Sequence, residues 1–309
     1  MRRYDLDQSR AIAILLILIG HSDGIPPLVD RIIYSFHVPL FFILSGILLC
    51  YKRIENRSWY QIIHSRIHRL IIPSFFWECI LSIFYYFIKG IPATQLIQNT
   101  LQLSFNLSVL WFVRCLLIAE FFCILLLKTS HHLPVLLLGM GASVLLAECI
   151  DLFYIQQAFT AAFYLLFGYC FEKYRHHIPK APWVLASLFL VWFLSARMNS
   201  RVDLCAFILG NTALYYLHST AGSLCIILFF LLLNKPIPLL NWFGQNSIGF
   251  LVTHVFVRFA IVQADHVLLG QDITSWALAF LLIILDSVVV WLIGRFFPEA
   301  FGQLRKTQV

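Results

Sequence analysis

The sequence predicts an all-α protein: a polytopic membrane bundle of about ten transmembrane helices with both chain ends in the cytoplasm. Three observations lead to this fold class. Of the 309 residues, 61% are hydrophobic and only 12% are charged, whereas about one quarter of a soluble domain is charged. The mean hydropathy is +0.84. The apolar residues also fall in long runs, unlike the roughly ten-residue alternating segments of a transmembrane β-barrel.

The apolar runs are the elements of this fold, because each approaches the ~20 residues that a helix needs to cross the hydrocarbon core. They cover residues 6–25, 33–50, 71–89, 108–127, 133–150, 154–171, 182–198, 212–233, 245–263 and 276–297. Segment 198–220 is a poor loop and a poor span, and it is left open as a span, a re-entrant segment or a segment on the membrane surface. No internal repeat or second domain is visible, so we expect one transmembrane domain over residues 1–309.

Positive charge predicts the orientation, because basic residues collect on cytoplasmic loops. With the N-terminus inside the cell, the outer connecting segments hold few basic residues, namely Arg31, Lys89, Arg197 and Arg201. The N-in/C-in orientation follows, and with it a location in the inner (cytoplasmic) membrane. The formal charge of +7 then needs no nucleic-acid partner.

Several classes of site are not indicated by the sequence. The eight cysteines are scattered, mostly in apolar runs, without a Cys-x-x-Cys pair, which is typical of small buried hydrophobic residues rather than of disulfides or zinc ligands. The sequence has no His-Glu-x-x-His pair, phosphate loop or nucleic-acid-binding motif. We therefore expect no bound metal and no bound cofactor.

Two polar residues interrupt the first apolar run on one helix face. Arg10 and His21 are eleven residues apart, which is about three helical turns plus 20° and about 16 Å along the axis. Asp7 lies one turn before Arg10 and within its reach. A charged arginine in the bilayer costs about 2.5–3.5 kcal/mol unless it has a partner or faces a cavity. Arg10 therefore either reaches the cytoplasmic surface and pairs with Asp7, or lines a polar cavity with His21.

Several short motifs follow along the chain. After Arg10 and His21 come FHVPLFFILSG at 36–46, RIHRLIIP at 66–73, VLWFVRCLL at 109–117 and GQNSIGFLVTH at 244–254. In this order and spacing they resemble the acyltransferase-3 superfamily of integral membrane O-acyltransferases. The Phe-His-x-Pro-Leu-Phe-Phe segment most resembles its short branch, the fucose-4-O-acetylase-like sugar acetyltransferases.

The resemblance implies a membrane O-acetyltransferase. Such an enzyme would move an acetyl or other acyl group from cytoplasmic acyl-CoA to a hydroxyl of a surface or lipid-linked glycan. Acetyl-CoA would then be a co-substrate, membrane lipids would surround the chain, and a homo-oligomer is left open. The alternatives are a glycolipid or polysaccharide transporter or flippase, which intramembrane arginine and histidine suit equally, and a sensor or assembly subunit with an inactive site. The sequence shows no repeated halves of the kind many transporters have.

His21 is the candidate catalytic base, because an imidazole titrates near neutral pH and can take the proton of a sugar hydroxyl. The resemblance also gives this histidine the catalytic role. Alternatively, His21 only ends the first helix in a polar cluster with Ser22. His37 is the second catalytic candidate; it either faces His21 across the short first hairpin or ends its own helix at the interface. Ser45 lacks the turn of an acyl-serine nucleophile and, like Gly46, is better explained by helix packing.

Three arginines are the candidates for binding the donor. Arg66 and Arg69 lie three residues apart before the third run, and guanidinium groups offer forked donors to the phosphates of coenzyme A. Their alternative is positive-inside topology with contacts to lipid phosphates. Arg10 is the third candidate, because a polar line from Arg10 to His21 would let the acyl-carrying arm enter from the cytoplasm.

The candidate substrate-binding residues are Asp23, Trp111, Asn246 and His254. An interfacial tryptophan such as Trp111 is usually a membrane anchor, and a sugar-stacking surface is the alternative. The family shows a similar Asn-Ser and histidine at the position of the ninth run, so this helix is expected to line the same cavity. Three acidic residues in apolar runs, Glu78, Glu120 and Asp286, are expected to form buried ion pairs with Arg114 or Arg258.

Overall fold

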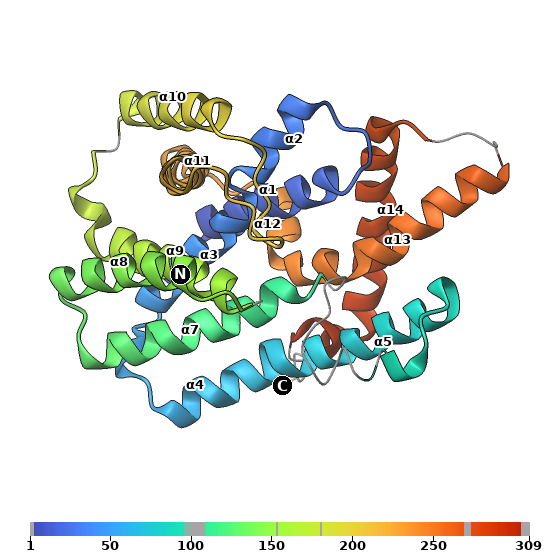
Figure 1. Cartoon of the computed structure of the whole chain (residues 1–309), viewed down its shortest axis with the longest axis horizontal. Helices are drawn as coiled ribbons and strands as arrows, with labels where there is room; N and C mark the ends of the chain where they lie inside the picture. The colour runs from blue at the N-terminus through green and yellow to red at the C-terminus, as the bar shows by residue number, and fades with distance from the viewer. Residues whose placement is uncertain are drawn as a thin grey trace.

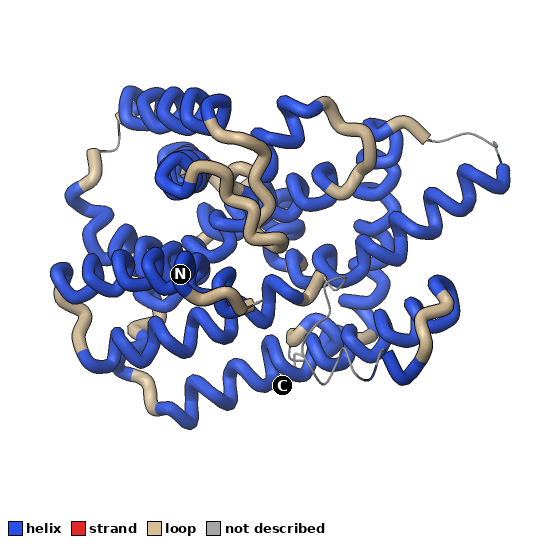
Figure 2. The backbone as a smooth tube through the Cα atoms, viewed as in Figure 1, coloured by secondary structure: helices blue, strands red, loops and turns tan. Residues whose placement is uncertain are grey.

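A computed structural model describes residues 3–95, 97, 109–152, 154–179, 181–268 and 273–303. Over these residues the chain forms helices joined by loops, without a named strand (Figure 2). The all-α fold class is therefore confirmed.

The α-helices have the following bounds. They are α1 (Tyr4–Gly20), α2 (Pro27–Tyr34), α3 (His37–Tyr51), α4 (Trp59–Arg66), α5 (Ile72–Lys89), α7 (Trp111–Thr129), α8 (Leu133–Cys149), α9 (Ile155–Tyr174), α10 (Pro182–Met198), α11 (Thr212–Leu233), α12 (Pro238–Gln245), α13 (Ser247–Leu268) and α14 (Ser275–Phe296). A π-helical segment, η2 (Ile67–Ile71), joins α4 to α5, and these two run as one rod along an edge of the bundle (Figure 1). Short 3₁₀ turns are η1 (Ile54–Asn56), η3 (Arg175–His177) and η4 (Pro298–Phe301).

The helices agree with the expected runs to within a few residues, except where a run is divided, extended or cut short. The first run was expected to reach residue 25, but α1 ends at Gly20. The second run begins inside α2, and the chain bends at Ser35 and Phe36 before α3 starts. The ninth run is divided at Asn246 between α12 and α13. The third helical rod begins at Trp59 instead of residue 71, because Ser58 and Gln61 form a capping box that starts a helix in the polar segment before the apolar run.

Five helices in the described part of the chain are long and apolar enough to cross a membrane. They are Pro27–Tyr51, which combines α2 and α3, Trp59–Ile88, which combines α4, η2 and most of α5, and the three helices α11 (Thr212–Leu233), α13 (Ser247–Leu268) and α14 (Ser275–Phe296). Two shorter apolar helices are Leu133–Cys149 and Pro182–Met198. The chain is thus a helical membrane bundle, whereas the count of ten spans and the N-in/C-in orientation stay predictions.

Glycines set the closest helix contacts. A Cβ atom on Gly46 of α3 would lie 2.0 Å from the carbonyl oxygen of Leu165 in α9, and one on Gly168 of α9 would lie 2.1 Å from that of Ile43 in α3. Only residues without a Cβ allow two helix backbones to approach so closely. The packing role expected for Gly46 therefore holds, and α3 and α9 form a closely packed pair within the larger apolar core.

Segment 198–220 is a folded loop, residues 199–211, that leads into α11. The backbones of Asp203 and Ile208 exchange two hydrogen bonds, and the amide side chain of Asn199 joins the loop's two ends through Ser200 and Asn211. The loop also buries three apolar side chains, Val202, Leu204 and Leu209. These contacts exclude a helical span for residues 199–211, and residues 212–220 belong to α11. A re-entrant segment and a segment on the membrane surface stay predictions for the loop.

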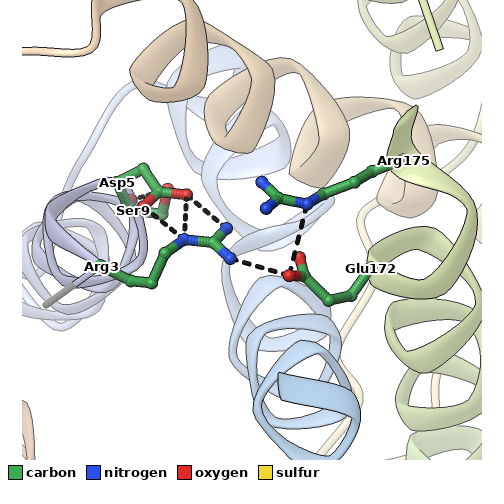
Figure 3. Close-up of polar contacts among 5 residues, drawn as sticks. All are labelled: Arg3, Asp5, Ser9, Glu172 and Arg175. Atoms are coloured by element: carbon green, nitrogen blue, oxygen red, sulfur yellow. Dashed lines mark hydrogen bonds and ion pairs between the residues drawn. The ribbon is translucent and has the colours of Figure 1, made fainter. Parts of the chain in front are cut away.

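The start of α1 is tied to the end of α9 by a shared carboxylate (Figure 3). The guanidinium of Arg3 lies 2.8 Å from Glu172 and 2.7 Å from Asp5, and Arg175 approaches the same Glu172 oxygen at 3.3 Å. Such networks restrain more than isolated surface pairs do. They fix the helix that carries Arg10 and His21.

Candidate functional site

A central cavity of about 580 Å³ runs between the helices, a volume within the usual range of small-molecule sites. Residues from α1, α3, the α4–η2 rod, α7, α13 and the 199–211 loop line it. Its polar lining residues fall into two groups. The histidine end comprises His21, His37 and His254, and the basic end comprises Arg10, Lys52, Arg66 and Arg69.

The helices α1 and α3 explain why the cavity has two different ends. His21 directly follows the last residue of α1, with Arg10 eleven residues before it, about 16 Å away along the helix. On α3 the order is reversed: His37 is the first residue and Lys52 directly follows the last, about 22 Å away. Because both helices line one cavity, their two histidines meet at one end and their two cations at the other.

The three histidines of the histidine end share one hydrogen-bonding arrangement. Each Nδ1 faces the backbone carbonyl four residues earlier; the acceptors are Ile17, Ile33 and Phe250, at 2.8, 2.7 and 3.0 Å. A carbonyl oxygen only accepts hydrogen bonds, so Nδ1 carries the proton. In a neutral ring the lone pair is then on Nε2, which is the nitrogen available to act as a base.

The rings of His21 and His254 lie against each other. Their centroids are 4.9 Å apart with 71° between the planes. His254 is fully buried, and its Nε2 has no hydrogen-bond partner among the described residues. Since buried polar atoms are normally satisfied, this unpaired nitrogen of a residue that lines the cavity is a candidate to bind a ligand atom or a water. On the other side, the ring of Tyr34 packs edge-on at 5.0 Å from that of His37.

The basic end holds more positive than negative charge. Arg66 binds Glu120 through two hydrogen bonds of 2.5 and 3.1 Å, and Arg10 lies 3.6 Å from Asp7. Lys52 and Arg69 form no ion pair with any residue that the structure describes. Guanidinium and ammonium groups gathered in this way favour a polyanionic ligand such as a phosphate ester.

Lys52 lies at the end of α3, just outside the Pro27–Tyr51 span. Burial and the repulsion of Arg66 and Arg69 lower the pKa of Lys52 to about 8. An anion bound beside this ammonium would oppose both effects.

The π-helical segment carries one of the basic residues. Arg69 lies within η2, and π-bulges in α-helices are frequent at functional sites. The backbone of Arg69 is backed by Gly302, where an added Cβ would lie 2.5 Å from the Arg69 carbonyl oxygen. Close by, Trp77 donates its indole N–H to the carbonyl of Ala300 at 2.8 Å. The turn after α14 therefore supports the segment from behind.

Seven of the nine candidate site residues line the cavity: Arg10, His21, His37, Arg66, Arg69, Trp111 and His254. Asp23 and Asn246, both expected to bind substrate, do not. The Asp23 side chain is 78% exposed and pairs with Arg258. Asn246 donates to the carbonyl of Trp242 at 2.8 Å and accepts from Gln303 at 3.2 Å. Asn246 thus connects α12, α13 and the C-terminal turn.

Of the ion pairs expected for the three buried acids, one is confirmed and two are corrected. Glu78 pairs with Arg114 at 2.7 Å, as expected. Glu120 pairs instead with Arg66, and Asp286 accepts a hydrogen bond from Thr253 at 2.6 Å. The sequence could not distinguish these partners, because several cations lie within similar depths of the bundle.

Three cavity residues were missed by the sequence reasoning: Tyr34, Lys52 and Asp203. Lys52 was counted among the basic residues that set topology, and its position directly after an apolar run was the available signal. Asp203 lies in the segment of undecided structure, 3.7 Å from Arg201. Arg201 in turn lies over the ring of Tyr34 at 4.2 Å.

No group of three or more His, Cys, Asp or Glu side chains in the described residues is placed to hold a metal ion. In the comparison with known proteins, the sequence model of the acyltransferase-3 family, described as an acyltransferase domain, matches residues 3–295. No curated protein and no solved structure matches the chain.

Proposed function

Because the chain belongs to the acyltransferase-3 family, we propose that it is a membrane O-acetyltransferase acting between cytoplasmic acetyl-CoA and a glycan. The acceptor would be a hydroxyl of a surface or lipid-linked glycan at the inner (cytoplasmic) membrane. The short fucose-4-O-acetylase-like branch is part of this proposal. One observation carries it: a single cavity joins a group of cations to a group of imidazoles.

The basic end suits the donor. Coenzyme A carries several phosphate groups, and Arg69 and Lys52 lack carboxylate partners in the described residues, so both are available to phosphate oxygens. Arg66 lies beside them with its orientation fixed by Glu120. The phosphates would remain at this end while the flexible thioester arm extends along α1 and α3 toward the histidines.

The histidine end suits proton transfer. In the proposed reaction, Nε2 of His21 takes the proton of the acceptor hydroxyl as its oxygen attacks the thioester carbonyl. A carbon–oxygen bond forms, the tetrahedral intermediate collapses, and the carbon–sulfur bond breaks. The imidazolium of His21 then returns the proton to the departing thiolate. His37 and His254 present further Nε2 atoms that can orient the reacting groups.

The acceptor would lie among Tyr34, Trp111 and Asp203. Trp111 starts α7, nine residues before Glu120, so it lies about 13.5 Å along the helix from the basic end. Aromatic rings offer flat surfaces to sugars, and a carboxylate such as Asp203 accepts hydrogen bonds from their hydroxyls. Trp111 was expected to bind substrate, and Asp203 takes the place that the sequence reasoning gave to Asp23.

The test is acetyl transfer by purified protein in detergent and in liposomes. Radiolabelled acetyl-CoA is supplied with a lipid-linked glycan, and wild type is compared with His21→Ala at equal amounts of folded protein. Transfer to glycan or hydrolysis to acetate that depends on His21 supports the enzyme. Movement of glycolipid across liposomes without any release of acetyl from acetyl-CoA would replace the proposal with the transporter alternative.

A further inference from the structure

The turn that follows α1 is held by side chains from three other helices. The last carbonyls of a helix have no partner inside it and must find one elsewhere. Three backbone carbonyls of the turn accept hydrogen bonds from side chains. The hydroxyl of Tyr34 donates to Gly20 at 3.3 Å, Nε of Arg258 donates to His21 at 2.8 Å, and the hydroxyl of Ser275 donates to Gly24 at 3.0 Å. Gly24 has a φ of +79°, which glycine adopts without strain. The candidate base therefore lies in a turn that is fixed from outside α1.

Arg258 makes two of the contacts to this turn. Its Nε donates to the carbonyl of His21, and its Nη2 donates to the carboxylate of Asp23. The planar guanidinium can hold both acceptors at once, which a lysine ammonium on a flexible stem does less well. One turn earlier on the same helix, His254 packs against the ring of His21. A single helix, α13, thus contacts both the backbone and the ring of His21.

We infer that Arg258 is a positioning residue for the transfer reaction. This inference rests on the proposed function, in which His21 is the base. Arg258 does not line the central cavity, so it acts through the backbone of His21 rather than by touching substrate. It holds the turn in the place where His21 lines the cavity beside His254. Displacement of a reacting group by about 1 Å can lower a rate about a hundredfold, so loss of this contact should reduce turnover.

The experiment compares four variants: Arg258→Gln, Arg258→Lys, Asp23→Asn and the control Arg295→Gln. Arg295 is an exposed arginine on α14 whose guanidinium lies 5.7 Å from the ring of Trp291. Each protein is purified, and size-exclusion chromatography confirms that it is folded. Two quantities are measured: hydrogen exchange of the backbone amides of residues 17–24, and kcat with the KM for acetyl-CoA.

Arg258→Gln should accelerate exchange at His21 and Ser22, whose amides bond to Ile17 and Ile19. Its kcat should fall about tenfold to a hundredfold while the KM for acetyl-CoA stays within about twofold, because donor binding lies at the other end of the cavity. Arg258→Lys should recover part of kcat. Asp23→Asn should change kcat less than Arg258→Gln, because the bond to the His21 carbonyl remains. Arg295→Gln should match wild type.

The two measurements separate this inference from the proposed function. Unchanged exchange in both Arg258 variants would show that the arginine does not hold the turn, and would overturn the inference without reference to catalysis. Faster exchange with full kcat would also overturn it, since the turn would then be mobile without consequence. Absence of acetyl transfer in wild type would remove the proposed function itself, and the positioning role would fall with it.

Discussion

The imidazole of His254 lies edge-on to that of His21, with ring centroids 4.9 Å apart, although the two residues are 233 positions apart in the chain. Both rings have Nδ1 bound to the preceding helical turn. Both residues line the same end of the cavity, and in each ring Nε2 is the nitrogen not bound to its own helix. If His21 is the base, the neighbouring His254 can bind the acceptor or a water.

His254→Phe should keep the packing but lose the unpaired nitrogen. We expect transfer to fall about tenfold to a hundredfold, which corresponds to one buried hydrogen bond of about 1–3 kcal/mol. His21→Ala should lose more, about 10²- to 10⁴-fold, because it removes the acid–base group. Initial rates of glycan acetylation measure both. His64→Ala, on the exposed face of α4, is the control, and equal rates for His254→Phe and wild type would contradict the prediction.

Arg66 and Arg69 should behave differently although they were predicted as one donor-binding pair. Arg69 has no ion-pair partner in the described residues, so Arg69→Ala should raise the KM for acetyl-CoA with little change in thermal stability. Arg66→Ala leaves the buried carboxylate of Glu120 unpaired, and removing one partner of a buried pair costs about 3–5 kcal/mol. Thermal unfolding in detergent and donor kinetics measure the two effects separately.

The double variant Arg66→Ala with Glu120→Ala provides the control for that comparison. It should regain stability relative to Arg66→Ala, because no buried carboxylate is left unpaired. It should keep the raised KM for acetyl-CoA if Arg66 also binds phosphate. A wild-type KM in this variant would assign Arg66 a purely structural role.

The local part of this architecture could be predicted from the sequence. Residues 182–198 and 212–233 were expected as spans, and α10 and α11 have these bounds. Arg10 and His21 were placed on one face by helical periodicity alone, and both line the cavity. Apolar runs and helical periodicity are short-range properties, so they could be assigned without knowing how the helices pack.

The long-range part could not be predicted. The pairing of Arg258 with Asp23 joins residues 235 positions apart. The pairing of Arg66 with Glu120 was one of several ion pairs that the positions of these residues along their apolar runs allowed. Lys52 lies at the basic end because α3 runs along the cavity in the direction opposite to α1, so that the last residues of α3 lie near Arg10. Such contacts depend on which helices pack together, and that in turn depends on backbone approaches such as that of Gly46 to Leu165.

Donor binding should depend on pH through Lys52. The pKa of its ammonium is lowered to about 8, and a phosphate bound beside it would raise that pKa, so binding should take up a proton above pH 8. The affinity for desulfo-coenzyme A should therefore weaken between pH 8 and 9.5 in wild type, by at most about tenfold per pH unit. In Lys52→Arg it should weaken less, because the guanidinium stays charged.

Calorimetry at pH 8.5 in two buffers of different ionisation enthalpy measures this proton uptake directly. Wild type should show uptake, and Lys52→Arg should show less. Arg53→Lys is a matched control, since Arg53 adjoins Lys52 but does not line the cavity. Equal proton uptake in wild type and Lys52→Arg would exclude Lys52 as its source.

The orientation of the bundle can be tested with single cysteines in a variant whose eight native cysteines are replaced. Asn56 lies at an exposed position beyond the basic end, and Ser200 lies at an exposed position of the 199–211 loop at the histidine end. With the N-terminus in the cytoplasm, an impermeant thiol reagent added outside intact cells should label Ser200→Cys. The same reagent should label Asn56→Cys only after the membrane is opened. Labelling of both positions from one side would contradict the predicted orientation.

A third cysteine tests whether the donor arm enters the cavity. Ser45 lines the cavity on α3, eight residues after His37 and seven before Lys52, about 12 and 10 Å along the helix. An arm that extends from the basic end to the histidines must pass this position. Acetyl-CoA should therefore protect Ser45→Cys from a small thiol reagent and leave Ser200→Cys unprotected. This protection should disappear in a variant that combines Ser45→Cys with Arg69→Ala, when the concentration of acetyl-CoA is below the raised KM of that variant. Full labelling of Ser45→Cys under saturating acetyl-CoA would show that the donor takes another route, whichever way the bundle is oriented.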